Sequence, residues 1–316
     1  MKKTHLALTL LLLTIGLVAC TEKPNSPSSH NGESSSDIAT IGFDENGASI
    51  AIFSVGEERY VRFSRGNLQY KPITSTWKFA NTQYEYIGEA DTNTSELYND
   101  WIDLFGWGTS GYDNGAVAFK PTSISTEFAD YYPGGENPTN DLTGDYARCD
   151  WGVYNSISNG GNTAAIWRTL TTTEWCYLLS YGQQANIYRT GKWGIGTIAG
   201  QHHGLILLPD VWTLPDGVTF VPGIASGWNT NIYGIEQWIL MEKAGAVFLP
   251  AAGRRNGNTV SFVGYYGDYW STTHYNAEKA YTLSFGNKFL DADRTTPRNQ
   301  GCSVRLVMDI DNNTKQ

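Results

Sequence analysis

Residues 265–307 read YYGDYWSTTHYNAEKAYTLSFGNKFLDADRTTPRNQGCSVRLV, and their apolar side chains recur at every second position in two places. Apolar and polar residues alternate over 281–285 and again over 304–306, which is the pattern of a strand with one buried face. The polar segment 286–300 between them is predicted to be a loop. The C-terminal end should therefore hold two antiparallel strands around that loop.

The same alternation appears near the start of the body of the chain. Segments 48–55 (ASIAIFSV) and 59–70 (RYVRFSRGNLQY) are joined by Gly56, Glu57 and Glu58, which predicts a hairpin. Two short apolar runs further along, GLILLPD at 204–210 and GAVFLPAAG at 245–253, are long enough for core strands and too short for helices.

Helical spacing is clear in two segments. In 171–182, Thr171 is the predicted N-cap, Glu174 its capping-box partner and Gly182 the stop. In 234–245, a second helix should end at Gly245. The predicted buried faces are Trp175, Leu178 and Leu179 in the first helix, and Ile235, Trp238 and Ile239 in the second.

The hexapeptide GWGTSG at 106–111 matches a dinucleotide-binding pattern by letter only. That chemistry needs a strand before the first glycine and a helix after the last, so that amides point at the pyrophosphate. Here 94–106 has helical spacing of its own, with Leu97, Trp101, Leu104 and Phe105 on one face. We therefore expect a helix that ends at Gly106, and no dinucleotide.

The composition favours a β-rich, loop-heavy domain. The chain holds 34 Gly, 19 Tyr and 11 Trp with 17% charged residues, and few long segments have helical spacing. The formal net charge of −9 without a basic run argues against nucleic-acid binding. No metalloprotease, serine-hydrolase or phosphate-loop motif is present, and the adjacent His202 and His203 lack ligands at metal spacing. We predict no metal site and no cofactor.

The N-terminal segment predicts export and anchoring. A basic start and an apolar stretch end at Leu17-Val18-Ala19-Cys20, which resembles a bacterial lipoprotein signal. The expectation is a signal peptide over 1–19, lipid on Cys20, a disordered tether over 20–37 and a short tail at 311–316. The lipid would hold the protein at the cell envelope, with the outer membrane favoured. Of the other cysteines, Cys149, Cys176 and Cys302 are expected to be buried hydrophobic side chains, or to form one disulfide and one free thiol.

Several segments together resemble bacterial C-type-lectin-like domains of the Fibrobacter major paralogous domain type. They are WRTLTTTEW at 167–175, GAVFLPAAG at 245–253, YWSTT and AYTLSF within 269–285, and GCSVRLV at 301–307. The resemblance implies one α+β domain over 38–310, with a small twisted antiparallel sheet, two to three helices and long loops. It also implies that the first and last strands, near 60–68 and 303–307, pair with each other.

The wider superfamily bears on whether the protein is an enzyme. Its formylglycine-generating branch uses two C-terminal cysteines that bind copper, whereas 264–307 contains only Cys302, which we expect in the core. Calcium-dependent relatives bind calcium and sugar hydroxyls with a Glu-Pro-Asn motif. Here Glu136-Asn137-Pro138 has the residues in a different order, so that chemistry is not expected. The resemblance therefore implies a non-catalytic protein that binds a glycan or a protein. A structural subunit of a surface assembly is the alternative, and an enzyme is the least favoured.

The candidate ligand-binding residues lie where retroelement-diversified relatives vary. Tyrosine offers contact area at low entropic cost, and Asn, Asp and Arg offer polar contacts. The predicted set is Tyr265, Tyr266, Asp268, Tyr269, His274, Tyr275, Asn276, Asn287, Asp291 and Arg294, with Lys288 and Asp293 beside them. Trp270 is expected in the core. Arg254 and Arg255 are expected either at this surface or in solvent.

Overall fold

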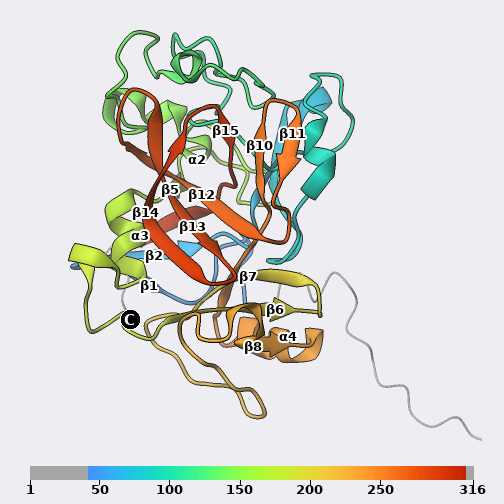
Figure 1. Cartoon of the computed structure of the whole chain (residues 1–316), viewed down its shortest axis with the longest axis vertical. Coiled ribbons are helices and arrows are strands. Elements are labelled where there is room, and N and C mark those ends of the chain that lie inside the picture. The colour runs from blue at the N-terminus through green and yellow to red at the C-terminus, as the bar shows by residue number, and fades with distance from the viewer. Residues whose placement is uncertain (1–41, 311–316) are drawn as a thin grey trace, which may run out of the picture. The chain divides into compact units, whose positions relative to one another are not determined.

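The computed structural model describes residues 42–310, so the predicted signal peptide, Cys20, the tether and the tail lie outside the described residues. Its first sheet joins both ends of this range, with strand order β1-β2-β16-β5 (Figure 1). Phe63 pairs with Val307 and Tyr60 with Ile310 in antiparallel register. The predicted pairing of first and last strands is confirmed. The strands are β1 (Phe53–Gly56), β2 (Arg59–Phe63), β5 (Arg168–Thr169) and β16 (Leu306–Ile310).

A second four-stranded sheet has the order β8-β6-β7-β9 and carries the two predicted core strands. The strands β6 and β8 are parallel, and the other neighbours are antiparallel. Helix α4 (Ile235–Lys243) follows β8 and lies beside this sheet (Figure 1). The strands are β6 (Trp193–Ile198), β7 (His202–Leu207), β8 (Asn231–Tyr233) and β9 (Val247–Pro250).

The C-terminal segment forms a three-stranded antiparallel sheet, β12-β13-β14. Its strands are β12 (Tyr266–His274), β13 (Lys279–Gly286) and β14 (Phe289–Pro297). The prediction of a loop at 286–300 is therefore wrong, since most of this segment forms β14. Its aspartates and Arg294 are poor strand formers, but β14 needs only one partner and leaves those side chains partly exposed at the edge of the sheet.

Two small sheets complete the β structure. One has the order β11-β10-β15, and the other is the hairpin β3-β4. Short 3₁₀ segments connect many of the elements. The remaining strands are β3 (Leu68–Lys71), β4 (Thr76–Phe79), β10 (Arg254–Asn256), β11 (Thr259–Ser261) and β15 (Gln300–Gly301). The 3₁₀ segments are η1 (Pro72–Thr74), η2 (Gly88–Thr92), η3 (Phe128–Tyr131), η4 (Gly144–Cys149), η5 (Gly182–Gln184) and η6 (Gly227–Asn229).

The helices are short. Helix α2 spans Trp151–Tyr154, and α3 spans Thr172–Leu178 with the predicted capping box of Thr171 and Glu174. Helix α3 ends before Gly182, because Ser180 already has a left-handed φ of 52°. The buried face of α4 is Trp238, Met241 and Glu242, and the predicted Ile235 is 38% exposed.

The helix expected over 94–106 does not form. The carboxylate of Asp91 accepts the amides of Asp103 and Leu104, both at 2.8 Å, and the backbone of Ile102 pairs with that of Tyr70. These partners hold the chain extended. Gly106 is needed for a different reason: a Cβ there would lie 2.3 Å from the Tyr131 ring.

Buried apolar residues gather in three clusters. The largest lies between the first sheet, α3 and the inner faces of β7, β9 and β13, and a second contains Trp270 and Cys302, as expected. The third packs α4 against β7 and β9. The fold class is thus mixed α+β, with small antiparallel sheets and few helices. Over 42–310, no helix has the length and apolar character to cross a membrane.

Candidate functional site

The sequence-predicted site residues lie at two ends of the β12–β13–β14 sheet. Tyr265 and Tyr266 are at the start of β12, whereas His274, Tyr275 and Asn276 are at its end. Eight residue steps along a strand span about 27 Å. The predicted set therefore does not form one continuous binding surface.

Two predicted binding residues are in the interior. Asp268 and Tyr269 are fully buried, because they lie within β12 and not in a loop before it. The carboxylate of Asp268 accepts the Ser284 hydroxyl at 2.6 Å, and burial raises its pKa. The Tyr269 hydroxyl donates to the Pro250 carbonyl at 2.8 Å, and burial raises the pKa of this phenol as well. Neither side chain can contact a ligand directly, so these two predictions are corrected.

The end of β12 that carries His274 is a closed hydrogen-bond network. The backbone amide and Nδ1 of His274 both bond to Asp141, at 2.8 and 2.5 Å. Asn276 accepts the amides of Glu278 and Lys279, each at 2.9 Å, so it caps the β12–β13 turn. Tyr275 remains 50% exposed.

The predicted residues in β14 and in the turn before it mostly support neighbouring segments. Asn287 accepts the amide of Trp228 at 2.7 Å, and Asp291 accepts the Tyr181 hydroxyl at 3.4 Å. Arg294 lies 5.8 Å from the centroid of the Phe289 ring. Asp293 and Lys288 are exposed.

Aromatic rings gather at the other end of the sheet. The rings of Phe262 and Tyr266 stack at 4.8 Å, and Phe289 meets Tyr266 edge to face at 5.4 Å. The Arg254 guanidinium lies 5.0 Å from the Phe262 ring centroid. Tyr265 is 69% exposed and Phe262 47% exposed. Phe262, Tyr265, Tyr266 and Phe289 are called the aromatic edge below.

A hollow of about 510 Å³ adjoins the aromatic edge. Two polar atoms of its lining, Nε of Arg254 and Oε1 of Gln300, are buried and lack a hydrogen-bond partner among the described residues. That Nε forms an ion pair with Asp268 at 3.6 Å, a distance too long for a hydrogen bond. The hollow is lined by Arg254, Asn256, Thr259, Ser261, Phe262 and Gln300, and is called the β10–β15 hollow.

Sequence reasoning missed most of this hollow. Gly257-Asn258 is a two-residue hairpin signal between β10 and β11, and Gly257 has a φ of 55°. Arg254 and Arg255 were expected either at the binding surface or in solvent, and Arg254 does line the hollow. Arg255 does not, because it is buried and donates to the Leu104 carbonyl at 2.9 Å.

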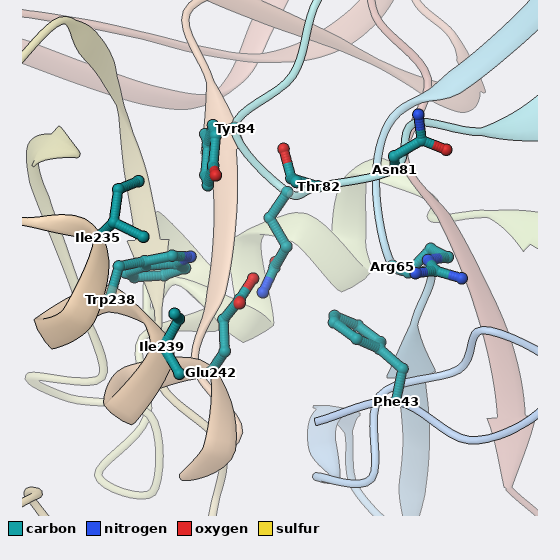
Figure 2. A pocket seen from close by; sticks show the side chains of 10 residues that line it. Phe43, Arg65, Asn81, Thr82, Tyr84, Ile235, Trp238, Ile239 and Glu242 are labelled. Atoms are coloured by element: carbon teal, nitrogen blue, oxygen red, sulfur yellow. The ribbon is translucent and has the colours of Figure 1, made fainter. Parts of the chain in front are cut away.

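A second, enclosed cavity lies between α4 and the segment 81–84 (Figure 2). Its volume of about 10 Å³ is enough for one water molecule. Glu242 points into it, and burial raises the pKa of this carboxyl to about 7 against the opposing effects of Gln83, Arg305 and Arg65. The cavity is too small for an organic ligand, so Glu242 belongs to the core.

The thiols and histidines form no reactive cluster within 42–310. Cys149, Cys176 and Cys302 are free and buried, and burial raises the pKa of each thiol. His203 stacks on Trp228 at 5.0 Å, and His202 lies 5.0 Å from the Tyr84 ring. In that range no three His, Cys, Asp or Glu side chains are placed to hold a metal ion.

Comparison with known proteins gives one match. A family model described as "Domain of unknown function (DUF8237)" matches residues 234–307, from the start of α4 to β16. No curated protein matches the chain, and no solved structure matches it. The matched segment contains the aromatic edge and every residue that lines the β10–β15 hollow.

Proposed function

We propose that this protein is a non-catalytic binding protein whose ligand, preferably a glycan, occupies the β10–β15 hollow and the aromatic edge. The observation that carries the proposal is the hollow in which Nε of Arg254 and Oε1 of Gln300 lack a hydrogen bond, beside the half-exposed ring of Phe262. A buried polar atom without a partner costs free energy, and a ligand hydroxyl would recover it.

The lining chemistry suits a sugar. Aromatic faces pack on the apolar face of a sugar ring, and amide, hydroxyl and guanidinium groups hydrogen-bond to its hydroxyls. Asn256, Thr259 and Gln300 supply those polar groups on rigid strands. Tyrosine and arginine also dominate protein interfaces, so a protein ligand is the second candidate for the same surface.

The C-type-lectin-like fold and the envelope location complete the proposal. The antiparallel pairing of β2 with β16 supports that fold, because the resemblance implies paired terminal strands. Lipid on Cys20 would tether the domain to the cell envelope, an inference that rests on the sequence of the N-terminal segment. The raised pKa of the Cys302 thiol disfavours thiolate chemistry, which supports a binding role.

The test is binding of a tagged, non-lipidated chain to a glycan array, with calcium and then with a chelator. We expect reproducible hits that weaken about tenfold or more in Phe262→Ala and Gln300→Ala. Tyr275→Ala is the matched control, because Tyr275 is similarly exposed but lies at the opposite end of β12.

Three outcomes decide the matter. A blank array in both buffers would overturn the glycan proposal and favour a protein ligand. Equal losses in the Tyr275 variant and the Phe262 variant would show that the hollow is not the site. Loss of binding with chelator would show that the recognition needs calcium.

A further inference from the structure

A third concave surface lies at the β1–β2 turn, and no residue of it belongs to the β10–β15 hollow. Its volume is about 800 Å³, within the range of small-molecule sites. Figure 1 shows β1, β2 and α3 well apart from β10 and β11. The lining residues are Ser54, Gly56, Glu57, Glu58, Tyr60, Tyr177, Tyr188 and Asp210, and this surface is called the tyrosine groove.

The floor of the tyrosine groove is rigid and electrically balanced. Arg189 is fully buried and its Nη1 donates to Asp210 at 2.8 Å, while its other nitrogens donate to the Leu178 and Leu208 carbonyls. Asp210 also accepts the amide of Ser54 at 3.1 Å. The buried guanidinium of Arg189 thus compensates the charge of Asp210, and these bonds fix the position of the carboxylate.

Two further carboxylates at the rim are not compensated. Glu57 and Glu58 are exposed, and among residues 42–310 no cation pairs with either. Of the neighbouring cations, Arg59 pairs with Glu174. Lys192 donates to the backbone carbonyl of Asp210 at 3.2 Å, so it adds one positive charge against the two negative charges of Glu57 and Glu58. The groove therefore presents net negative charge to solvent.

Three tyrosines from separate elements form the walls. Tyr60 comes from β2, Tyr177 from α3 and Tyr188 from the loop after η5. Tyr188 is 74% exposed. Burial, and then the carboxylates of Asp210 and Glu57, raise the pKa of the Tyr177 phenol.

Tyrosine faces beside uncompensated carboxylates are the chemistry that recognises organic cations. The ring quadrupole attracts an ammonium or guanidinium group, and the carboxylates add charge and hydrogen-bond acceptors. A neutral sugar could donate hydroxyl groups to Glu57 and Glu58, but only a cation is also attracted by their uncompensated charge. We propose that the tyrosine groove binds an alkylammonium or guanidinium group, either of a free polyamine or of a basic peptide side chain.

The turn supplies an unusually clean test variant. Glu58 has a left-handed φ of 54°, a conformation that favours Asn or Gly over Glu. Glu58→Asn removes the carboxylate and suits the backbone better, so the variant should be at least as stable as the natural protein. A loss of binding in this variant cannot then be blamed on unfolding, which a thermal melt would verify.

The experiment is calorimetric titration of the full-length protein in detergent with two probes, spermidine and a blocked hexalysine peptide. The same peptide with acetylated lysines is the neutral control. We expect cation binding that weakens about tenfold in the double variant Glu57→Gln, Glu58→Asn. Glu127→Gln, which changes an exposed carboxylate outside the groove, should leave binding unchanged.

Each outcome has a defined meaning. Binding of spermidine and peptide alike supports a free amine as the source, and binding of the peptide alone supports a protein partner. Absence of heat with both probes overturns the proposal. Binding that survives in the double variant also overturns it, because the cation would then sit elsewhere on an acidic protein. None of these results depends on the β10–β15 hollow.

Discussion

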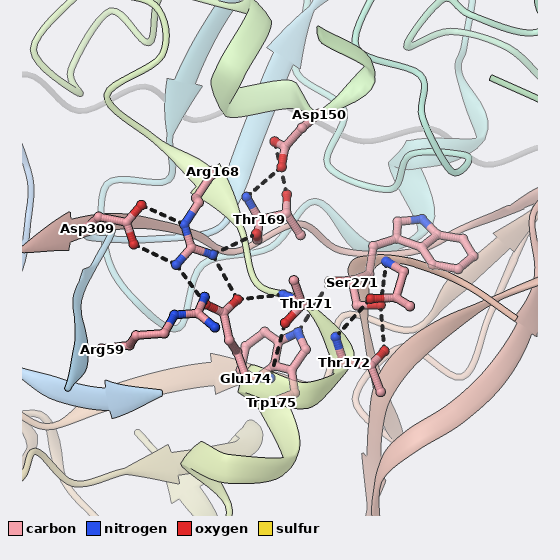
Figure 3. A network of polar contacts seen from close by, with 12 residues as sticks. Arg59, Asp150, Arg168, Thr169, Thr171, Thr172, Glu174, Trp175, Ser271 and Asp309 are labelled. Atoms are coloured by element: carbon pink, nitrogen blue, oxygen red, sulfur yellow. Dashed lines mark hydrogen bonds and ion pairs between the residues drawn. The ribbon is translucent and has the colours of Figure 1, made fainter. Parts of the chain in front are cut away.

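Arg168 and Glu174 form a two-pronged ion pair, with Nη1–Oε2 and Nη2–Oε1 distances of 2.8 Å each (Figure 3). The Glu174 side chain is fully buried, and Arg59 pairs with it from β2. The same carboxylate accepts the Thr171 amide at 2.8 Å, and Arg168 continues to Asp309 at 2.6 Å. One carboxylate thereby connects α3 to three strands of the first sheet.

Replacing Glu174 should therefore destabilise the fold strongly. Glu174→Ala leaves Arg168 without its buried partner and removes half of the capping box, and we expect a loss of about 2–4 kcal/mol in the free energy of unfolding. Urea denaturation would measure it. The matched control is Glu96→Ala, which breaks the exposed Lys120–Glu96 pair and should change nothing measurable. Similar values for both variants would contradict the structural role of Glu174.

Glu242 should give the protein a characteristic pH dependence. Its pKa is about 7 in the folded protein against 4.5 in the unfolded chain, so the folded state holds a proton that the unfolded state releases between these values. The stabilisation is complete below pH 4.5 and is lost as the pH rises to 7, by about 3 kcal/mol. Glu242→Gln is neutral at every pH, so its stability relative to the natural protein should rise across this window. A difference that does not vary with pH would refute this.

The hydroxyl groups of Tyr269 and Tyr265 should differ in their contribution to stability. Tyr269→Phe removes a buried hydroxyl that contacts the Pro250 carbonyl and Asn67, and should cost about 1–3 kcal/mol of folding free energy. Tyr265→Phe changes a side chain that is 69% exposed and should leave the melting temperature unchanged. Thermal melts of the two variants decide the point. An unchanged melting temperature in Tyr269→Phe would mean that its hydroxyl bonds contribute nothing.

The three described thiols should be inert in the native protein. Burial raises the pKa of Cys149 to about 11 and that of Cys176 to about 12, and it raises that of Cys302 as well. In a chain with Cys20→Ser, a thiol reagent at pH 8 should label them no faster than the protein unfolds. Urea should then expose all three. Rapid labelling of the native protein would contradict the burial.

Local signals predicted the elements that local contacts stabilise. The capping box of Thr171 and Glu174 lies within one helical turn, so helix α3 could be read from the sequence. The hairpin β1–β2 is equally local. The false helix at 94–106 failed because Asp91, outside the segment, takes the amides of Asp103 and Leu104. A periodic pattern does not reveal that competition.

The candidate site shows the same limit. Asp268 and Tyr269 have the side chains of a binding loop, yet Ser284 and Pro250, distant in sequence, satisfy them inside the core. Tyr265 and Tyr275 were correctly expected at the surface but lie at opposite ends of one strand. The hollow beside Gln300 depends on the pairing of β10 with β15. The sequences of these two short strands do not predict that pairing.

The position of β16 between β2 and β5 has a consequence for biosynthesis. During translation the ribosome releases β2 and β5 long before β16 exists, so the first sheet can close only after residue 310 has left the exit tunnel. Contacts between such distant residues slow folding, and the unpaired edge of β2 is exposed in the meantime. The first sheet of the nascent chain therefore stays incomplete until β16 emerges.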